Sequence, residues 1–366
     1  MKIAIIGTRG VPARYGGFET AAEEISLGLA SKGHNVSVYC RYANVVGNPQ
    51  EFKGVKLIYI PHIDSKNIGT LSHSFLSFFH AIHQNYDVIL AFNVGIAPLC
   101  IIPRLFGKKV VLNVDGLEWK RRKWSWFARI YFKFCEYLAP KIVDRIITDS
   151  RVIQKYYQDR YHALSTYIAY GAYGGKSTNP GILKKYGVKR GDYFLVLSRL
   201  EPENNADLII KSFERVKTVK RLLIIGGVSY KSDYAAKLKE TKDSRILFSA
   251  PIYDKNDLKE LFCNCYVYIH GNEVGGTNPA LLKAMGYANC ILALNVPFNA
   301  EVVGGSTLLF DKSVEDLSNK MEFILKHPKI VAEYRKKAVD RVRKLYTWDK
   351  IIDKYEGLFK EILDKI

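Results

Sequence analysis

Short apolar runs rich in β-branched residues recur along the first half of the chain, and segments with helical spacing separate most of them. The runs are KIAIIG (2–7), NVSVYC (35–40), VKLIYI (55–60), DVILAF (87–92), KVVLNV (109–114) and DRIITD (144–149). Continuous apolar strands that alternate with helices are typical of a parallel sheet covered on both faces. The first half therefore predicts a doubly wound, Rossmann-like α/β domain.

A second series of apolar runs follows a glycine-rich break, TYIAYGAYGG (166–175), and the polar stretch KSTNPG. Its members are YFLVLS (193–198), RLLIIG (221–226), RILFSA (245–250), YVYIHG (266–271), CILAL (290–294) and TLLF (307–310). This pattern predicts a second α/β domain of similar size. We place the two domains at residues 1–172 and 173–346.

The end of the chain, WDKIIDKYEGLFKEIL, has the spacing of an amphipathic helix. Its apolar residues fall on one helical face: Trp348, Ile351, Ile352, Tyr355, Leu358, Phe359 and Ile362. The spacing predicts a separate closing helix within residues 347–366.

The stretch GTRGVPARYGGFET (7–20) lies between the first predicted strand and the first predicted helix. Glycine allows positive φ and close approach of a ligand, and a helix start offers free N–H groups to an anion, so the stretch favours a phosphate-facing loop. A plain strand-to-helix connection is the alternative. A nicotinamide fingerprint fits less well, because Arg9 replaces its second glycine and the next strand ends at Arg41 where an acidic residue is expected. Ligands of such sheets bind beyond the carboxyl ends of the strands, so we expect one cleft between two facing domains.

The bulk properties of the sequence set further limits. The chain has 366 residues, which favours two domains, and no apolar run reaches the ~18 residues that a membrane-spanning helix needs. The N-terminus enters a strand without the pattern of a signal peptide, so we expect a cytoplasmic protein. The six cysteines show no paired metal-ligand spacing, and we expect buried thiols, no metal and no disulfide.

The net charge of +19, from 55 basic and 36 acidic residues, favours an anionic partner such as nucleic acid, an acidic membrane or a phosphorylated small molecule. The chain has no zinc-finger spacing and no aromatic RNA-binding signature, so we expect no nucleic acid. The segment KRRKWSWFARIYFKF (120–134) interleaves basic and aromatic residues, as an interfacial helix on an anionic membrane does. A solvated basic helix is the alternative. The candidate membrane residues are Lys120, Arg121, Arg122, Lys123, Trp124, Trp126 and Phe127.

Three segments carry a family resemblance: VPARYGGFET (11–20), SRLEPENNADLII (198–210) and HGNEVGGTNPALLKAMG (270–286). They resemble bacterial rhamnosyltransferases that start surface-polysaccharide repeats, a branch of the retaining GT-B glycosyltransferases. The resemblance implies a GT-B fold, with the acceptor bound mainly by the first domain and a nucleotide-diphosphate sugar mainly by the second. It also implies a closing helix that returns to the first domain and transfer with retention without a cofactor or a metal.

The substrates that the resemblance favours are L-rhamnose from dTDP-rhamnose and a polyprenyl-diphosphate-linked saccharide. We therefore expect a peripheral protein on the inner face of the cell membrane, with a nucleotide sugar donor, a lipid-linked acceptor and an anionic membrane surface as partners.

The donor-binding candidates lie at the loops of the resembling segments. Arg199 matches the family arginine that holds the donor diphosphate, for which a planar guanidinium is suited. Asn204 stands where many relatives have a lysine, and Lys283 stands where relatives have a glutamate that accepts from the donor ribose. The full set is Gly16, Gly17, Arg199, Asn204, Asn205, Gly275, Gly276, Thr277, Asn278 and Lys283.

The catalytic candidates are carboxylates that follow predicted strands. Glu273 is placed to stabilise positive charge at the anomeric carbon or to contact the sugar hydroxyls. Asp115, Glu118 and Asp149 are candidates to orient or deprotonate the acceptor hydroxyl, although Asp115 suits a helix cap equally well. Two alternatives stay open: a nicotinamide-dependent oxidoreductase, and a GT-B protein that has lost turnover, because the Lys283 ammonium cannot accept a hydrogen bond from the ribose.

Overall fold

The computed structural model describes residues 1–13, 16–42, 47–65, 68–114, 116–121, 124–228 and 232–364. The chain forms two compact units. The first unit is Met1–Gly171 together with Trp348–Ile366, and the second unit is Ala172–Thr347.

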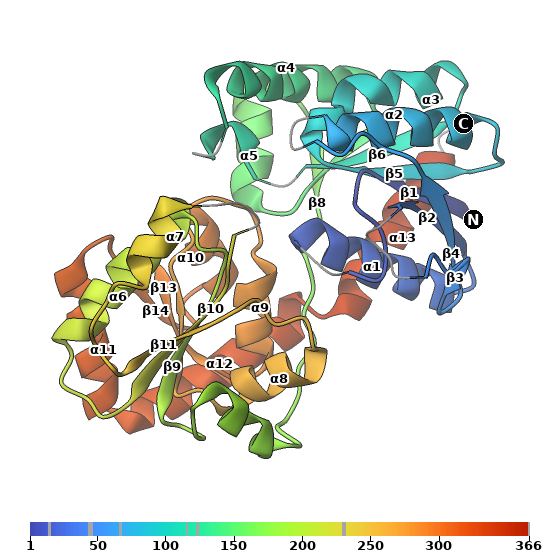
Figure 1. Cartoon of the computed structure of the whole chain (residues 1–366). Coiled ribbons are helices and arrows are strands. Elements are labelled where there is room, and N and C mark those ends of the chain that lie inside the picture. Colours follow the sequence, from blue (N-terminus) through green and yellow to red (C-terminus); the bar gives the residue numbers. More distant parts are fainter. Residues whose placement is uncertain are drawn as a thin grey trace. The chain divides into compact units, whose positions relative to one another are not determined.

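The first unit is an α/β domain whose elements alternate along the chain (Figure 1). They are β1 (Lys2–Ile6), α1 (Gly17–Ser31), β2 (Asn35–Arg41), β3 (Glu51–Phe52), β4 (Val55–Ile60), α2 (Gly69–Ile82), β5 (Val88–Phe92), η1 (Val94–Cys100), α3 (Ile101–Leu105), β6 (Lys109–Val114), η2 (Glu118–Lys120), α4 (Trp126–Ile142), β7 (Arg145–Thr148), α5 (Arg151–Tyr161), β8 (Ser165–Tyr167) and α13 (Trp348–Asp364).

The sheet of the first unit has the order β3-β4-β2-β1-β5-β6-β7-β8. All its described pairings are parallel except the short β3–β4 pair. Helices α2, α3 and α4 lie on one side of the sheet, and α1 and α13 lie on the other (Figure 1). The strands at the centre are buried on both faces, which explains their continuous apolar sequences.

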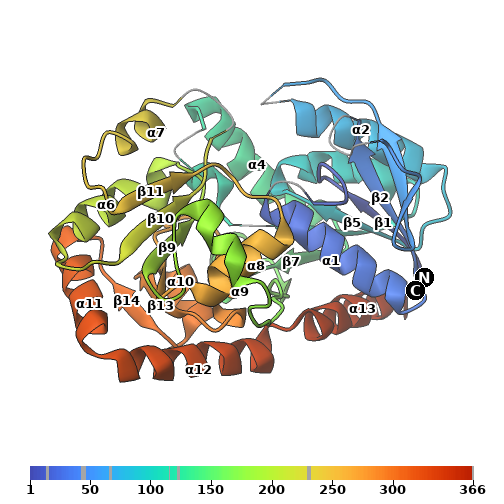
Figure 2. The ribbon, with the colours of Figure 1, turned by 60° about the horizontal axis from the view of Figure 1, so that its bottom comes forward.

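The closing helix α13 packs on α1 within the first unit, as Figure 2 also shows. The seven apolar residues predicted for one face of α13 are all buried. Gly28 of α1 makes the close approach possible, because a Cβ atom there would lie 2.0 Å from Cδ1 of Ile352. On the same side of the sheet, the Asn113 amide donates to Tyr355 Oη at 2.6 Å.

The second unit is also α/β. Its elements are η3 (Pro180–Tyr186), β9 (Tyr193–Leu197), η4 (Pro202–Asn204), α6 (Ala206–Arg215), β10 (Arg221–Ile225), α7 (Asp233–Leu238), β11 (Ile246–Ser249), α8 (Lys255–Asn264), β12 (Val267–His270), α9 (Pro279–Gly286), β13 (Cys290–Leu294), α10 (Pro297–Val303), β14 (Leu308–Phe310), α11 (Val314–Lys326) and α12 (Pro328–Leu345).

The sheet of the second unit has the order β11-β10-β9-β12-β13-β14, and its described pairings are parallel. Its core joins strand residues such as Phe194 and Ile269 to helix residues such as Phe213, Leu317 and Met321. From β9 the chain adds β10 and β11 on one side, and from β12 it adds β13 and β14 on the other side. The strand order therefore reverses between β9 and β12. This switch point is where an open α/β sheet offers a crevice to a ligand.

Candidate functional site

Two loops meet at the switch point of the second sheet. The first follows β9 and carries Arg199, Asn204 and Asn205, and the second follows β12 and runs from Gly271 to Asn278. The candidates for the donor diphosphate and for the reacting sugar therefore lie at the carboxyl ends of neighbouring strands of one sheet.

Backbone hydrogen bonds and buried amides join these two loops. The Glu273 N–H donates to Glu203 O at 2.9 Å, and the Asn205 side chain donates to Gly271 O at 2.8 Å. The Asn204 side chain donates to Arg199 O at 2.7 Å. Both asparagines are buried, so in this structure their amides position the loops. Asn205 has a φ of 54°, a left-handed conformation that asparagine tolerates better than most residues.

Glu273 lies half-buried with a cationic neighbour from another loop. Its carboxylate pairs with the Lys312 ammonium, which follows β14. Lys312 therefore places a second positive charge, besides Arg199, at the carboxyl edge of this sheet. Sequence reasoning missed Lys312 because its position in the loop after β14 says nothing about Glu273, 39 residues earlier.

The N-terminus of α9 follows the glycine pair Gly275–Gly276. Gly275 has a φ of +152° and open space where a Cβ atom would be. Asn278 caps the helix, because its side chain accepts from Ala280 N at 2.9 Å. Pro279 fills the first helical position and Thr277 is buried. Lys283 is half-buried one turn into the helix.

Two further polar residues at this edge were not predicted from the sequence. His270 ends β12 fully buried, and burial lowers its pKa to about 3, so its imidazole is neutral. Glu203 is 2% exposed, and neither of its carboxylate oxygens has a hydrogen-bond partner in the described part of the chain. The signal for His270 was available, since it is the one polar residue of the strand VYIH.

In the first unit, the loop after β1 is held by the helix that follows it. The Arg9 N–H donates to Glu19 Oε1 at 3.3 Å, and the Ala13 N–H donates to a Glu23 carboxylate oxygen. Gly16 precedes α1 with a φ of 96°, and Gly17 is the first residue of the helix. Two amides of the predicted phosphate-facing loop are therefore already hydrogen-bonded to carboxylates. Arg14, in the same loop, lies outside the described residues.

The predicted acceptor-side carboxylates have different surroundings. Glu118 accepts from Arg121 Nε at 2.6 Å and from Trp124 Nε1 at 3.1 Å. Asp149 is fully buried after β7, and α5 begins two residues later. Asp115 lies outside the described residues.

The segment 120–134 is not a single helix, because α4 begins only at Trp126. Ser125 caps α4 by accepting from Ala128 N. Trp126 and Phe127 are strongly exposed, and Lys120 is exposed, whereas Arg121 and Trp124 turn toward Glu118. Arg122 and Lys123 lie outside the described residues.

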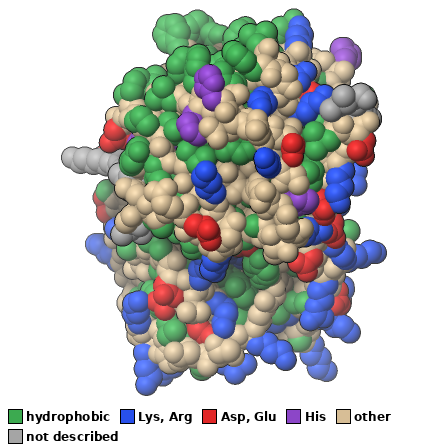
Figure 3. All heavy atoms as spheres, turned by 90° about the vertical axis from the view of Figure 1, so that its right-hand side faces the viewer, with side chains coloured by type: hydrophobic (Ala, Val, Ile, Leu, Met, Phe, Trp, Pro, Cys, Tyr) green, Lys and Arg blue, Asp and Glu red, His purple; other side chains and the backbone are tan. Residues whose placement is uncertain are grey.

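An extended apolar surface lies on α2, α3 and α4. Hydrophobic side chains gather in the upper part of Figure 3, at the level where Figure 1 draws these helices. We use "apolar surface" for the exposed residues Phe75, Leu76, Phe79, Ile101, Leu105, Phe106, Trp126, Phe127, Ile130, Phe134 and Tyr137. Large exposed apolar patches are typical of interaction sites.

Helix α2 shows how unusual this surface is. It buries Phe78 and Ala81 together with His73, Ser74 and Ser77, and it exposes Phe75, Leu76 and Phe79. It also contains no Asp, Glu, Lys or Arg. The exposed face of α2 therefore carries large apolar side chains and no Asp, Glu, Lys or Arg.

Neither a membrane-spanning helix nor a metal-binding cluster occurs among the described residues. No helix among them has the length and apolar character to cross a membrane. Within the same residues, no group of three or more His, Cys, Asp or Glu side chains is placed to hold a metal ion. All six cysteines belong to the described part of the chain, and each is a free thiol.

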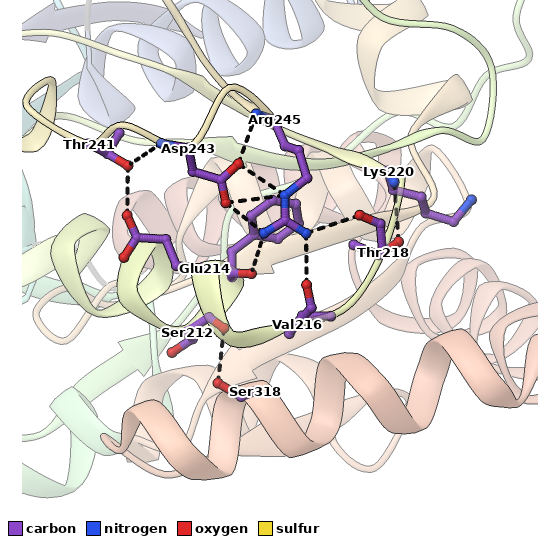
Figure 4. Close-up of polar contacts among 10 residues, drawn as sticks. Ser212, Glu214, Val216, Thr218, Lys220, Thr241, Asp243, Arg245 and Ser318 are labelled. Carbon is purple, nitrogen blue, oxygen red and sulfur yellow. Dashed lines mark hydrogen bonds and ion pairs between the residues drawn. The ribbon is translucent and has the colours of Figure 1, made fainter.

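The amino ends of the second sheet carry a charged cluster with a structural role (Figure 4). The Arg245 guanidinium donates to the Asp243 carboxylate and to the carbonyls of Val216 and Thr218. It also lies 4.8 Å from the centre of the Phe213 ring. Because these contacts use the guanidinium within the protein, the cluster ties α6 to the start of β11, at the edge opposite the candidate site.

Two family models match the chain, one over each half. Residues 182–344 match the family model described as "Glycosyl transferases group 1", and residues 1–173 match a domain of unknown function, DUF1972. No curated protein matches the sequence.

Several solved structures resemble the whole chain. Sucrose-phosphate synthase from Thermosynechococcus elongatus is 16% identical, with a TM-score of 0.79 and full coverage of both chains. HepE from Anabaena in complex with UDP is 16% identical (TM-score 0.77; 99% of this chain, 100% of that chain). A glycosyltransferase from Rickettsia africae is 14% identical (TM-score 0.78; 99% and 98%). At these identities the likeness concerns the fold, and it confirms the predicted GT-B fold class.

Proposed function

We propose that this chain, whose second unit is a glycosyl transferases group 1 domain, is a glycosyltransferase that takes its sugar from a nucleotide diphosphate. The observation that carries the proposal is the switch point of the second sheet. There, Arg199, the Glu273–Lys312 pair and the N-terminus of α9 lie at one edge of the sheet, where the loops after β9 and β12 hydrogen-bond to each other. HepE, a structural neighbour, is known in complex with UDP-glucose, which supports a nucleotide sugar as the donor.

Each residue at this edge has a role that follows from its chemistry. The Arg199 guanidinium holds the donor diphosphate through paired hydrogen bonds. Gly275 and Gly276 let the backbone approach the phosphates, and the first amides of α9 face them. Glu273 stabilises the positive charge that develops at the anomeric carbon. Transfer proceeds with retention and without a metal.

The first unit supplies the acceptor side of the reaction. Glu118 and Asp149, together with Asp115, are the carboxylates proposed to orient or deprotonate the acceptor hydroxyl. Gly16 and Gly17 at the start of α1 are proposed to meet phosphate through the backbone, since an N-terminal helix end favours anions.

The acceptor that we propose is a saccharide linked to a polyprenyl diphosphate at the inner face of the cell membrane, and the sugar is L-rhamnose from dTDP-rhamnose. The apolar surface of the first unit and the net charge of +19 support a peripheral position on an anionic membrane. Basic side chains stand on the same helix as the exposed aromatic ones, with Lys133 and Lys141 on α4.

Donor binding and turnover test the proposal separately. Arg199→Ala should weaken binding of dTDP and of dTDP-rhamnose together by roughly 1.5–3 kcal/mol in calorimetry, because it removes a charged hydrogen-bonding partner. Glu273→Gln should keep donor affinity and lower turnover, since an amide has the shape of the carboxylate without its charge. Arg215→Ala, at an exposed position at the end of α6, is the matched control and should change neither. A chelator should leave turnover unchanged.

Two results would contradict this assignment. If Arg199→Ala binds the nucleotide as the wild type does, the diphosphate does not lie at this edge. If every variant and the wild type bind the donor but none transfers sugar to a lipid-linked or soluble acceptor, the chain is a binding protein with a glycosyltransferase fold.

A further inference from the structure

A pocket of about 600 Å³ opens beside the apolar surface of the first unit. Its walls come from the segment after β4, from α2, η1 and α4. The lining residues that matter here are Ile63, Leu71, Phe75, Leu76, Leu99 and Tyr131. The volume falls in the range of roughly 300–1,000 Å³ that is common for small-molecule sites.

The wall of the pocket on the α4 side is fixed by close packing. The Tyr131 hydroxyl donates to Gly95 O at 2.8 Å, and a Cβ atom at Gly95 would lie 3.0 Å from the Phe132 ring. Helix α4 therefore sits directly on η1. The α2 side is the exposed apolar face described above, so two lining residues, Phe75 and Leu76, are also part of the apolar surface. A hydrocarbon chain can pass from the apolar surface into the pocket without meeting a charged side chain on α2.

One end of the pocket lies beside the Arg41 guanidinium, and burial and Arg41 lower the pKa of His62 there. His62 lines it, and Arg41 lies next to His62: a Cβ atom at Gly69 would lie 3.6 Å from Arg41 Nη1 and 4.0 Å from His62 Cδ2. Arg41 Nη2 donates to Thr70 Oγ1 at 2.8 Å, whereas its Nε is buried and has no hydrogen-bond partner in the described residues.

The neighbours of Arg41 set the charge at this end. Burial and the nearby Arg9 lower the pKa of Arg41, while the carboxylates of Glu19 and Asp64 act in the opposite direction. Two guanidinium groups and an imidazole thus face two carboxyl groups beside the uncapped N-terminus of α2. An anionic group bound at this end interacts with the guanidinium groups of Arg41 and Arg9. Glu19 then serves as the second anionic partner of these guanidinium groups.

We infer that this pocket is a subsite for the isoprenoid chain of a lipid diphosphate, with the diphosphate held at the Arg41–His62 end. An amphiphile with one apolar chain and one anionic group matches the two ends of the pocket, which a peptide helix or a second copy of the chain does not. The inference rests on the proposed function, because it takes the lipid part of the proposed acceptor as the occupant.

Farnesyl diphosphate, a short soluble isoprenoid diphosphate, is the probe. Leu76→Glu places a carboxylate in the wall of the pocket at an exposed helix position, and it should weaken farnesyl diphosphate binding at least tenfold. Leu105→Glu is the matched control, since Leu105 is 77% exposed on the apolar surface and does not line the pocket. It should bind the probe as the wild type does, yet both variants should bind vesicles of anionic lipid less well. Phe75→Glu repeats the test at a second lining position.

Ligand comparisons test the Arg41–His62 end. The wild type should bind farnesyl diphosphate at least tenfold more tightly than farnesol or inorganic pyrophosphate. His62→Ala should lower the affinity for farnesyl diphosphate about threefold and leave farnesol binding unchanged. The unfolding transition followed by tryptophan fluorescence serves as the folding control, because the variants and all four tryptophans lie in the first unit.

Equal binding of farnesyl diphosphate by the wild type, Leu76→Glu and Phe75→Glu would overturn the inference. So would a wild-type dimer in light scattering that Leu76→Glu dissociates, with no probe bound, because a second copy would then cover the surface. If the probe binds as expected but no sugar reaches any lipid diphosphate, the subsite stands and the proposed transfer reaction fails.

Discussion

The Glu260 carboxylate offers the sharpest test of how the second unit is held together. Glu260 is 1% exposed on α8 and accepts hydrogen bonds from Ser177 Oγ, from Thr178 N at 2.7 Å and from Asn179 N at 2.9 Å. The Asn264 amide donates to it as well, at 3.1 Å. It thereby anchors the start of the second unit, residues 177–179, to α8.

These donors decide the charge state of Glu260. Burial alone would raise the pKa, but the hydrogen bonds from Ser177, Thr178 and Asn179 outweigh it and lower the pKa from 4.5 to about 2. A folded-state pKa below the unfolded value contributes stability that is present above the unfolded pKa and is lost as pH falls toward the folded one. The shift corresponds to about 3 kcal/mol at neutral pH.

Glu260→Gln should therefore lower the free energy of unfolding of the second unit by about 3 kcal/mol at pH 7. The difference in unfolding free energy between the wild type and the variant should narrow by about 2 kcal/mol by pH 3. Most of the stability that comes from ionised Glu260 is lost at that pH. Glu240→Gln, at an exposed position just after α7, is the control and should show little difference at either pH.

The assay can assign the unfolding transition to its unit. All four tryptophans, Trp119, Trp124, Trp126 and Trp348, belong to the first unit, so tryptophan fluorescence in urea follows that unit alone. Circular dichroism follows both units. The account of Glu260 would be refuted if the difference in unfolding free energy were the same at pH 7 and pH 3. It would also be refuted if the difference appeared only in the transition followed by fluorescence.

Two further predictions concern the site and the closing helix. Lys283→Glu should tighten binding of a thymidine- or uridine-diphosphate sugar and raise turnover, because a carboxylate accepts from ribose hydroxyls and an ammonium does not; weaker binding in calorimetry would make Lys283 itself a donor contact. Gly28→Leu should destabilise the first unit by about 1–3 kcal/mol through overpacking against Ile352. Its double variant with Ile352→Ala should recover part of that loss in the tryptophan-monitored transition, and strict additivity would argue against the α1–α13 contact.

The strands could be read from the sequence because most are buried on both faces. Every apolar run that we named becomes a strand, with ends that differ by at most one residue. The strands that the pattern missed are β3 and β8, at the two edges of the first sheet. They have two and three residues, and none of these is buried, so they leave no continuous apolar run.

The candidate site shows where sequence reasoning stops. The motifs place Arg199 and Glu273 on loops after strands, but only the pairing of β9 with β12 brings those loops together. The sequence also does not indicate that the Asn205 amide donates a hydrogen bond to Gly271 O. In the same way, α2 carries three phenylalanines close together in sequence, and only the fold shows that Phe78 is buried while Phe75 and Phe79 are exposed.

The return of α13 to the first unit also sets the order in which the protein can be completed during synthesis. The chain leaves the first unit after Gly171 and re-enters it at Trp348, 177 positions later. At about 5–20 residues per second, the ribosome needs about 9–35 s for that interval. Throughout it the second unit is being made while the side of α1 that receives Ile352 stays uncovered. The first unit to be translated is thus the last to be completed. A chain truncated before Trp348 lacks α13, the helix that covers this side of α1.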